Sequence, residues 1–208
     1  TVTARLIAIA NQKGGVGKTT TSVNLATAMA ACGRRVLLVD FDPQGNASTG
    51  FGVDLRERLA NSYRLLTGEV TAVGACLKTD IENLDLLPAV VDLSAAEIEL
   101  AEIEDREFRL KNALKSVMSD YDYIFIDCPP SLGLLTVNAL CAAYCVIVPL
   151  QCEFYALEGL SQLMRTIETV QQGLNRSLVV QGIVLTMYDN RNRLSDMVAK
   201  DVRAHFGN

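Results

Sequence analysis

A glycine-rich stretch near the N-terminus constrains the fold of this chain more than any other feature. Residues 9–20 read IANQKGGVGKTT; an apolar run typical of a buried strand, Leu6–Ala10, leads into them, and a helical pattern follows. Glycines let successive backbone N–H groups turn inward around phosphate oxygens, and a helix that begins there adds its positive N-terminal end. The order of strand, loop and helix therefore predicts a phosphate-binding loop.

The loop also assigns roles to its own residues. Lys18 is expected to reach the β- and γ-phosphates, and the Thr19 hydroxyl to hold Mg²⁺. The predicted ligands are ATP or ADP with Mg²⁺. The alternative is a glycine-rich turn with solvated lysines, which leaves the order of strand, loop and helix unexplained. The residues expected to contact nucleotide are Gly14, Gly15, Val16, Gly17, Lys18, Thr19 and Thr20.

The loop departs from the general pattern G-x-x-x-x-G-K-[ST], because Gln12 stands where the first glycine falls and Lys13 precedes the glycine pair. This form, K-G-G-x-G-K-[ST], resembles the deviant Walker A family that includes ParA, MinD and the nitrogenase iron protein. The resemblance implies that Lys13 reaches across a dimer interface to the partner's nucleotide. It thus implies a homodimer in the ATP state, with Lys13 and Lys18 both catalytic.

Two further predicted strands end in aspartates. Val36–Asp40 leads to Asp42, and Tyr123–Asp127 has Walker B form. Ligands of open α/β sheets collect at the carboxyl ends of strands, where residues i and i+2 point the same way. One aspartate of the first pair can support Mg²⁺ and the other can orient water, while Asp127 would hold Mg²⁺ through a water. An ordinary Asp-Pro turn that caps a strand is the alternative for the first pair.

Residues 42–46, DPQGN, resemble the signature of ParA-type ATPases. By that resemblance Asp42 is catalytic and activates the hydrolytic water, whereas Asp40 supports the Mg²⁺ and phosphate region from behind. Residues 129–133, PPSLG, resemble the family's switch segment, which places Pro130 at the nucleotide. Residues 186–189 end the last strong strand, a place near the base in many phosphate-loop NTPases, and are a candidate adenine contact region.

Apolar runs alternate with amphipathic stretches along all 208 residues, half of which are hydrophobic. This pattern predicts one α/β domain over residues 1–208, a doubly wound, mostly parallel sheet flanked by helices. The expected strands are Leu6–Ala10, Val36–Asp40, Leu84–Leu87, Tyr123–Asp127, Cys145–Pro149 and Val179–Thr186. The expected helices are Thr19–Cys32, Leu55–Leu66, Ala95–Glu104, Arg106–Ser119, Leu132–Cys141, Ala156–Gly173 and Leu194–His205.

Composition narrows the partners. No apolar run approaches the ~20 residues that span a bilayer, and no signal peptide is visible, so we expect a cytoplasmic protein with no membrane partner. The six cysteines are scattered beside a single histidine, which argues against a zinc site and for reduced cysteines in the core. A net charge of −5 means that any DNA binding must come from a local patch.

Further segments, PLQCE at 149–153, ALEGL at 156–160 and LTMYD at 185–189, narrow the resemblance to ParA/Soj chromosome-partitioning ATPases over nearly the whole chain. The resemblance implies a nucleoid-associated switch. Its ATP-bound dimer binds DNA without sequence preference, and a ParB-type centromere-binding partner stimulates hydrolysis. Family members usually continue past residue 208, so we expect a missing C-terminal segment.

The resemblance places the DNA-binding residues near the C-terminus, at Arg191, Lys200 and Arg203. Lys200 and Arg203 are i, i+3 and share a face of the predicted helix. Residues 189–208 nevertheless hold four arginines and lysines against three aspartates. The alternative is therefore an ordinary solvated helix face.

Three other functions compete with a partitioning switch. A MinD-like ATPase that positions the division site would attach to membranes through a C-terminal amphipathic helix. An iron–sulfur carrier ATPase would share cysteines across a dimer axis, and Cys128 follows the Walker B strand directly. A metabolic kinase or ligase would need an acceptor-substrate constellation, and none stands out in the sequence.

Overall fold

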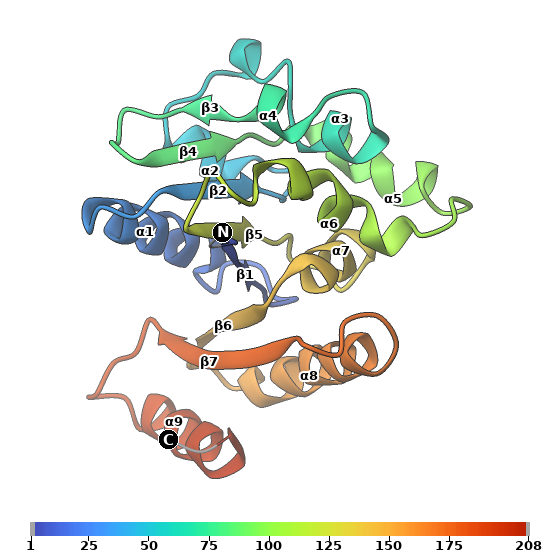
Figure 1. Cartoon of the computed structure of the whole chain (residues 1–208). Helices are drawn as coiled ribbons and strands as arrows, with labels where there is room; N and C mark the ends of the chain where they lie inside the picture. Colours follow the sequence, from blue (N-terminus) through green and yellow to red (C-terminus); the bar gives the residue numbers. More distant parts are fainter. Residues whose placement is uncertain (1–2, 207–208) are drawn as a thin grey trace.

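The computed structural model describes residues 3–206, and a seven-stranded sheet forms its centre (Figure 1). The strand order is β3-β4-β2-β5-β1-β6-β7, and only the β3–β4 pair is antiparallel among these neighbours. The doubly wound, mostly parallel α/β fold predicted from the sequence is confirmed. The strands are β1 (Arg5–Ile9), β2 (Val36–Asp40), β3 (Leu77–Lys78), β4 (Leu84–Leu87), β5 (Tyr123–Asp127), β6 (Cys145–Gln151) and β7 (Val179–Thr186).

Helices connect the strands and cover the sheet (Figure 1). The α-helices are α1 (Lys18–Ala31), α2 (Asn46–Gly50), α3 (Ser62–Thr67), α4 (Ala72–Ala75), α5 (Ala96–Glu99), α6 (Arg109–Leu114), α7 (Leu134–Ala142), α8 (Ala156–Gly173) and α9 (Arg193–Phe206). Short 3₁₀ turns are η1 (Leu55–Glu57), η2 (Val91–Ala95), η3 (Arg106–Phe108) and η4 (Lys115–Val117). The long helices α1, α8 and α9 and all six predicted strands are found within one or two residues of their expected ends.

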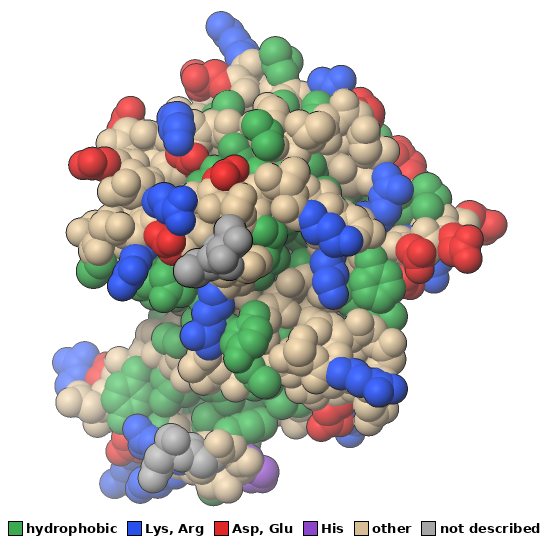
Figure 2. All heavy atoms as spheres, viewed as in Figure 1, with side chains coloured by type: hydrophobic (Ala, Val, Ile, Leu, Met, Phe, Trp, Pro, Cys, Tyr) green, Lys and Arg blue, Asp and Glu red, His purple; other side chains and the backbone are tan. Residues whose placement is uncertain are grey.

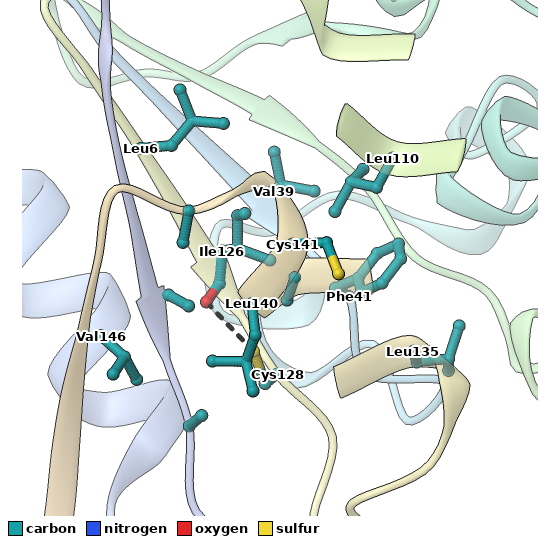
Figure 3. Close-up of a cluster of buried hydrophobic side chains, with 14 of the residues drawn as sticks. Leu6, Val39, Phe41, Leu110, Ile126, Cys128, Leu135, Leu140, Cys141 and Val146 are labelled. Atoms are coloured by element: carbon teal, nitrogen blue, oxygen red, sulfur yellow. Dashed lines mark hydrogen bonds between the residues drawn. The ribbon is translucent and has the colours of Figure 1, made fainter. Parts of the chain in front are cut away.

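The central strands are buried on both faces, which is why they read as continuous apolar runs. Successive side chains of a strand point to opposite faces. Leu37 and Val39 accordingly join a core with helices α3, α6, α7 and α8, whereas Val36 and Leu38 join a second core with α1. Figure 3 shows part of the first core, where Phe41 and Leu110 lie close to Cys141.

The predicted helix Leu55–Leu66 is wrong, because two short elements occupy that stretch. The turn η1 ends at Glu57, and α3 begins only at Ser62. Asn61 caps α3, since its side-chain oxygen accepts a hydrogen bond of 3.0 Å from the backbone N–H of Arg64. The capping residue thus fixes a helix start in the middle of the expected helix.

Two more predicted helices are shorter than expected. The helix expected over Ala95–Glu104 ends at Glu99, and the chain then turns to Asp105, which adopts a left-handed conformation with φ of 57°. The helix expected over Arg106–Ser119 is divided into η3, α6 and η4. The short elements α2, α4 and β3 were not predicted.

The β7 edge of the sheet is incompletely covered. Every residue of β7 is at least partly exposed, and α9 follows it. A groove of about 410 Å³ lies between the two, and Figure 2 shows hydrophobic side chains gathered there at the lower left. Within residues 3–206, none of the helices has the length and apolar character that crossing a membrane requires.

Candidate functional site

A cavity of about 360 Å³ opens where the carboxyl ends of β1, β2 and β5 meet. Its lining residues are Gly14, Gly15, Gly17, Lys18, Thr19, Thr20, Asp42, Gln44, Asn46, Pro130 and Met187. The structure therefore brings four separate predicted segments to one place, namely the phosphate loop, residues 42–46, residues 129–133 and residues 186–189. Val16 and Asp40 are not among the lining residues, and their predicted contributions to nucleotide binding stay predictions, whereas Gln44 and Asn46 line the cavity without having been predicted.

The end of β7 fixes the phosphate loop from one side. The Thr186 hydroxyl donates a hydrogen bond of 2.8 Å to the carbonyl of Val16, whose side chain is buried. Gly17 has φ of +88°, and a Cβ there would lie 3.4 Å from the Thr186 Cγ2. The left-handed backbone thus favours glycine at position 17, while the Thr186 methyl lies only at ordinary contact distance. The next residue of the predicted adenine region, Met187, lines the cavity.

The two lysines of the loop point to different places. The Lys18 side chain is buried, and its Nζ donates a hydrogen bond of 2.6 Å to the carbonyl of Lys13. Burial lowers the pKa of Lys18, although Asp127 opposes that shift. The Lys13 ammonium instead forms an ion pair with Glu153, which lies between β6 and α8, and Lys13 is about half exposed. Lys13 is therefore at the rim of the site.

Asp127 is the centre of the predicted magnesium site. Its carboxylate accepts hydrogen bonds of 2.8 Å from the hydroxyls of Thr19 and Ser22. Burial, followed by repulsion from Asp40, raises the pKa of Asp127 from its ordinary 3.8 to about 7. A carboxylate beside a hydroxyl is a donor set that suits Mg²⁺. Ser22 was not predicted as a partner of Asp127, although it stands one turn after Thr19 on the same helix.

The two aspartates after β2 have separate environments. Asp40 is buried, and its carboxylate accepts hydrogen bonds from the Ser48 backbone N–H at 2.8 Å and from the Ser48 hydroxyl at 2.6 Å. Burial raises the pKa of Asp40 as well. Asp42 lines the cavity and accepts a hydrogen bond of 3.0 Å from the Gln44 backbone N–H. Asp42 thus faces the site, while Asp40 anchors α2 behind it.

The predicted DNA-binding residues lie apart from this cavity. The Arg191 guanidinium is tied to Asp189 by hydrogen bonds of 3.0 and 2.9 Å, which raises the pKa of Arg191. Lys200 and Arg203 are exposed on α9, and Arg203 also lines the groove beside β7. The role of these three residues in binding DNA stays a prediction.

The cysteines take varied places. Cys128 follows Asp127, but its thiol points into the apolar core, where it donates a weak hydrogen bond of 3.8 Å to the Ile126 carbonyl (Figure 3). Burial raises the pKa of Cys128 and raises that of Cys141 to about 11. Cys32 is exposed, contrary to the expectation that every cysteine lies in the core.

Comparisons with known proteins extend this description. A family model described as an AAA domain matches residues 4–180. The chain is 60% identical over 205 residues to the chromosome partitioning protein ParA of Caulobacter vibrioides, which covers 98% of this chain and 77% of that protein. It is 52% identical to the sporulation initiation inhibitor protein Soj of Bacillus subtilis, over 97% of this chain and 80% of that protein.

Solved structures with the same fold are also similar to this chain. A cobyrinic acid a,c-diamide synthase from Mycobacterium smegmatis with bound ADP and magnesium superimposes with a TM-score of 0.93 at 46% identity, covering 98% of this chain and 82% of that one. A putative plasmid partition protein from Borrelia burgdorferi bound to AMPPNP has a TM-score of 0.84 at 29% identity, covering 96% and 81%.

Proposed function

The chain belongs to the ParA/Soj family of chromosome-partitioning ATPases, and from this premise we propose that it works as a dimerising switch. It uses ATP with Mg²⁺ as an ATPase. In the proposed cycle, two ATP-bound chains form a homodimer that binds DNA of the nucleoid without sequence preference. A ParB-type centromere-binding partner stimulates hydrolysis, the dimer dissolves and DNA is released.

Residues of the cavity divide the work of the cycle. Thr19 and Asp127 would hold Mg²⁺, which neutralises negative charge on the phosphate oxygens. The Lys18 ammonium, which contacts the Lys13 carbonyl in this structure, would bind phosphate oxygens. Asp42 would orient the attacking water, because its carboxylate faces the cavity from a fixed turn. Positioning and electrostatics supply most of the catalysis in phosphoryl transfer.

The placement of Lys13 supports a dimer more than any other observation. Lys18 already lies in the cavity, whereas Lys13 lies outside its lining and about half exposed at the rim. An exposed ion pair such as Lys13–Glu153 is weak, on the order of 1 kcal/mol or less. A phosphate group of the nucleotide bound to a second chain can therefore compete with Glu153 for the Lys13 ammonium. Lys13 is therefore available to act in trans.

Light scattering after gel filtration tests the dimer. Asp42→Ala should trap the ATP state, so we expect a dimer with ATP and a monomer with ADP. Adding Lys13→Ala to Asp42→Ala should give a monomer that still binds a fluorescent ATP analogue, whereas adding Lys18→Ala should strongly weaken nucleotide binding. A stable ATP-dependent dimer of the Lys13→Ala variant would refute the trans role.

DNA binding is tested by titration of a random-sequence duplex at about 50 and about 200 mM salt. We expect binding with ATP, little binding with ADP and a steep decrease with salt. Equal binding with ADP and ATP would refute the DNA step. ATP-dependent binding to anionic lipid vesicles would instead favour a MinD-like role. Hydrolysis that responds to cobyrinic acid rather than to DNA would favour the activity named for the Mycobacterium relative.

A further inference from the structure

Arg58 is a buried cation in an otherwise exposed stretch. Residues 54–57 and 59 are exposed, but Arg58 turns inward after η1 and is only 5% exposed. Its guanidinium donates five hydrogen bonds. The acceptors are the Val53 carbonyl at 3.1 and 2.8 Å, the Ala89 carbonyl at 3.1 Å, the Gly45 carbonyl at 3.5 Å and the Thr49 hydroxyl at 3.0 Å.

All of these acceptors are uncharged, so the burial of Arg58 is not explained by an ion pair. A buried charge is costly unless its donors are satisfied, and the planar fork of an arginine can serve several carbonyls at once. A lysine at this position would offer one compact ammonium and could not reach acceptors on opposite sides. The arrangement therefore requires arginine specifically.

The acceptors of Arg58 surround the turn that carries Asp42. The Gly45 carbonyl also accepts from the Thr49 backbone N–H at 3.0 Å, and the Gly45 N–H donates to the Asp42 carbonyl at 2.8 Å. Gly45 has φ of 64°, and a Cβ there would lie 2.5 Å from the Arg58 Nη1. The turn and the guanidinium are thus packed without spare room.

A second path runs from Arg58 to Asp40. The Ala89 carbonyl binds the guanidinium, and the Ala89 N–H donates to the Ser48 hydroxyl at 3.0 Å. That hydroxyl donates in turn to Asp40 at 2.6 Å. Arg58 therefore joins the loop after β4 to both ends of the segment between Asp40 and α2.

We propose that Arg58 is a positioning residue for ATP hydrolysis, because its guanidinium fixes the turn that presents Asp42, Gln44 and Asn46 to the cavity. The inference rests on the hydrolytic role proposed above for Asp42. The phosphate loop is held separately, through Asp127 and the end of β7. Loosening Arg58 should therefore slow hydrolysis and leave nucleotide affinity nearly unchanged.

Arg58→Lys in the full chain tests this separation. Single-turnover hydrolysis should be slower by on the order of 10-fold or more, since small displacements of catalytic groups carry effects of this size. The Kd for a fluorescent ATP analogue should stay within about 3-fold. The matched control is Arg56→Lys, an exposed arginine in the adjoining turn η1, which should leave both quantities unchanged.

Two outcomes would overturn the inference: hydrolysis within about 2-fold of the parent, or a parallel loss of rate and affinity. If thermal melts show that Arg58→Lys does not fold, Thr49→Val replaces it. That variant removes one acceptor of the guanidinium and should slow hydrolysis by about 2- to 3-fold, and an unchanged rate would then refute the inference.

Asp42→Ala in the same assay separates the two proposals. If Asp42→Ala hydrolyses ATP at the parental rate, the proposed role of Asp42 fails, and the inference about Arg58 fails with it. If Asp42→Ala is slow while Arg58→Lys and Thr49→Val match the parent, only the inference about Arg58 fails.

Discussion

The phosphate-loop end of the molecule and the α9 end place their charges in opposite ways. Asp127 is fully buried and is held by hydroxyls 108 and 105 residues away in sequence. The Arg191 side chain is 86% exposed and pairs with Asp189, two residues away. Buried long-range contacts are cooperative and little affected by salt, whereas exposed local pairs are weak and screened. Substitutions at the first end should therefore have large effects, and those at the second small, salt-dependent ones.

The largest expected effect is that of Lys18→Ala on nucleotide binding. Removal of a buried ammonium that binds the phosphates should weaken the affinity for ATP by on the order of 100-fold, because hydrogen bonds to charged groups are each worth about 1.5–3 kcal/mol. Fluorescence titration checks this, with the exposed Lys115→Ala as control. Equal ATP affinities of the two variants would mean that Lys18 contributes no more to nucleotide binding than an exposed surface lysine does.

The next effect concerns pH in the nucleotide-free chain. Asp127 has a pKa of about 7 when folded and 3.8 ordinarily, so between these values the folded state binds an extra proton. Stability should therefore fall as pH rises through this window and level off above pH 7. The Asp127→Asn variant should lose less stability from pH 5 to pH 8 than the parent does, by on the order of 1–3 kcal/mol.

Urea unfolding at several pH values, without nucleotide or Mg²⁺, measures this difference. Asp40 remains in the variant and retains a pH dependence of its own, because burial raises its pKa too. Parallel stability curves for parent and Asp127→Asn would show that the Asp127 carboxyl is not protonated in the folded chain near neutral pH.

A smaller effect is expected where the two kinds of charge meet, at the rim. Glu153→Gln releases the Lys13 ammonium from its ion pair. ATP-dependent dimerisation should then strengthen by about 2- to 5-fold, the size of an exposed pair. Analytical ultracentrifugation in the Asp42→Ala background measures it, with Glu168→Gln, exposed on α8, as control. Weaker dimerisation would show that Glu153 serves the dimer rather than competing with it.

The smallest effects should come from the α9 end and should have opposite signs. Arg191→Ala should weaken DNA binding by the ATP-bound protein by about 3-fold or less. Asp189→Asn should strengthen it by a similar factor, because the arginine loses its local partner. Both changes should shrink as salt rises, while Arg165→Ala on α8 should have no effect. Identical behaviour of all three variants would remove Arg191 from the DNA interface.

How well each part of the fold could be predicted depends on how strong its local sequence signal is. The strands β2, β4 and β5 have the predicted bounds, because a strand buried on both faces leaves a continuous apolar run, and the partly exposed strand β7 has its predicted bounds as well. The rest of residues 55–104, outside β4, was predicted poorly, since the elements there are short and tertiary contacts select their ends. Asn61 caps α3, and Arg58 binds the Ala89 carbonyl 31 residues away. Helical periodicity contains no trace of either contact.

The sequence by itself determined the phosphate loop, the positions of the main strands along the chain and the aspartates that follow them. Glycine spacing and apolar runs are local properties, so they can be read without the fold. It also indicated the family. Only the tertiary structure decided that Asp40 accepts a hydrogen bond from Ser48 outside the cavity lining. It also decided that Lys13 forms an ion pair with Glu153, and that the Ser22 hydroxyl donates a hydrogen bond to Asp127. The physical reason is that a side chain's partner depends on which segments the sheet brings together. The register between neighbouring strands is fixed only when the whole core packs.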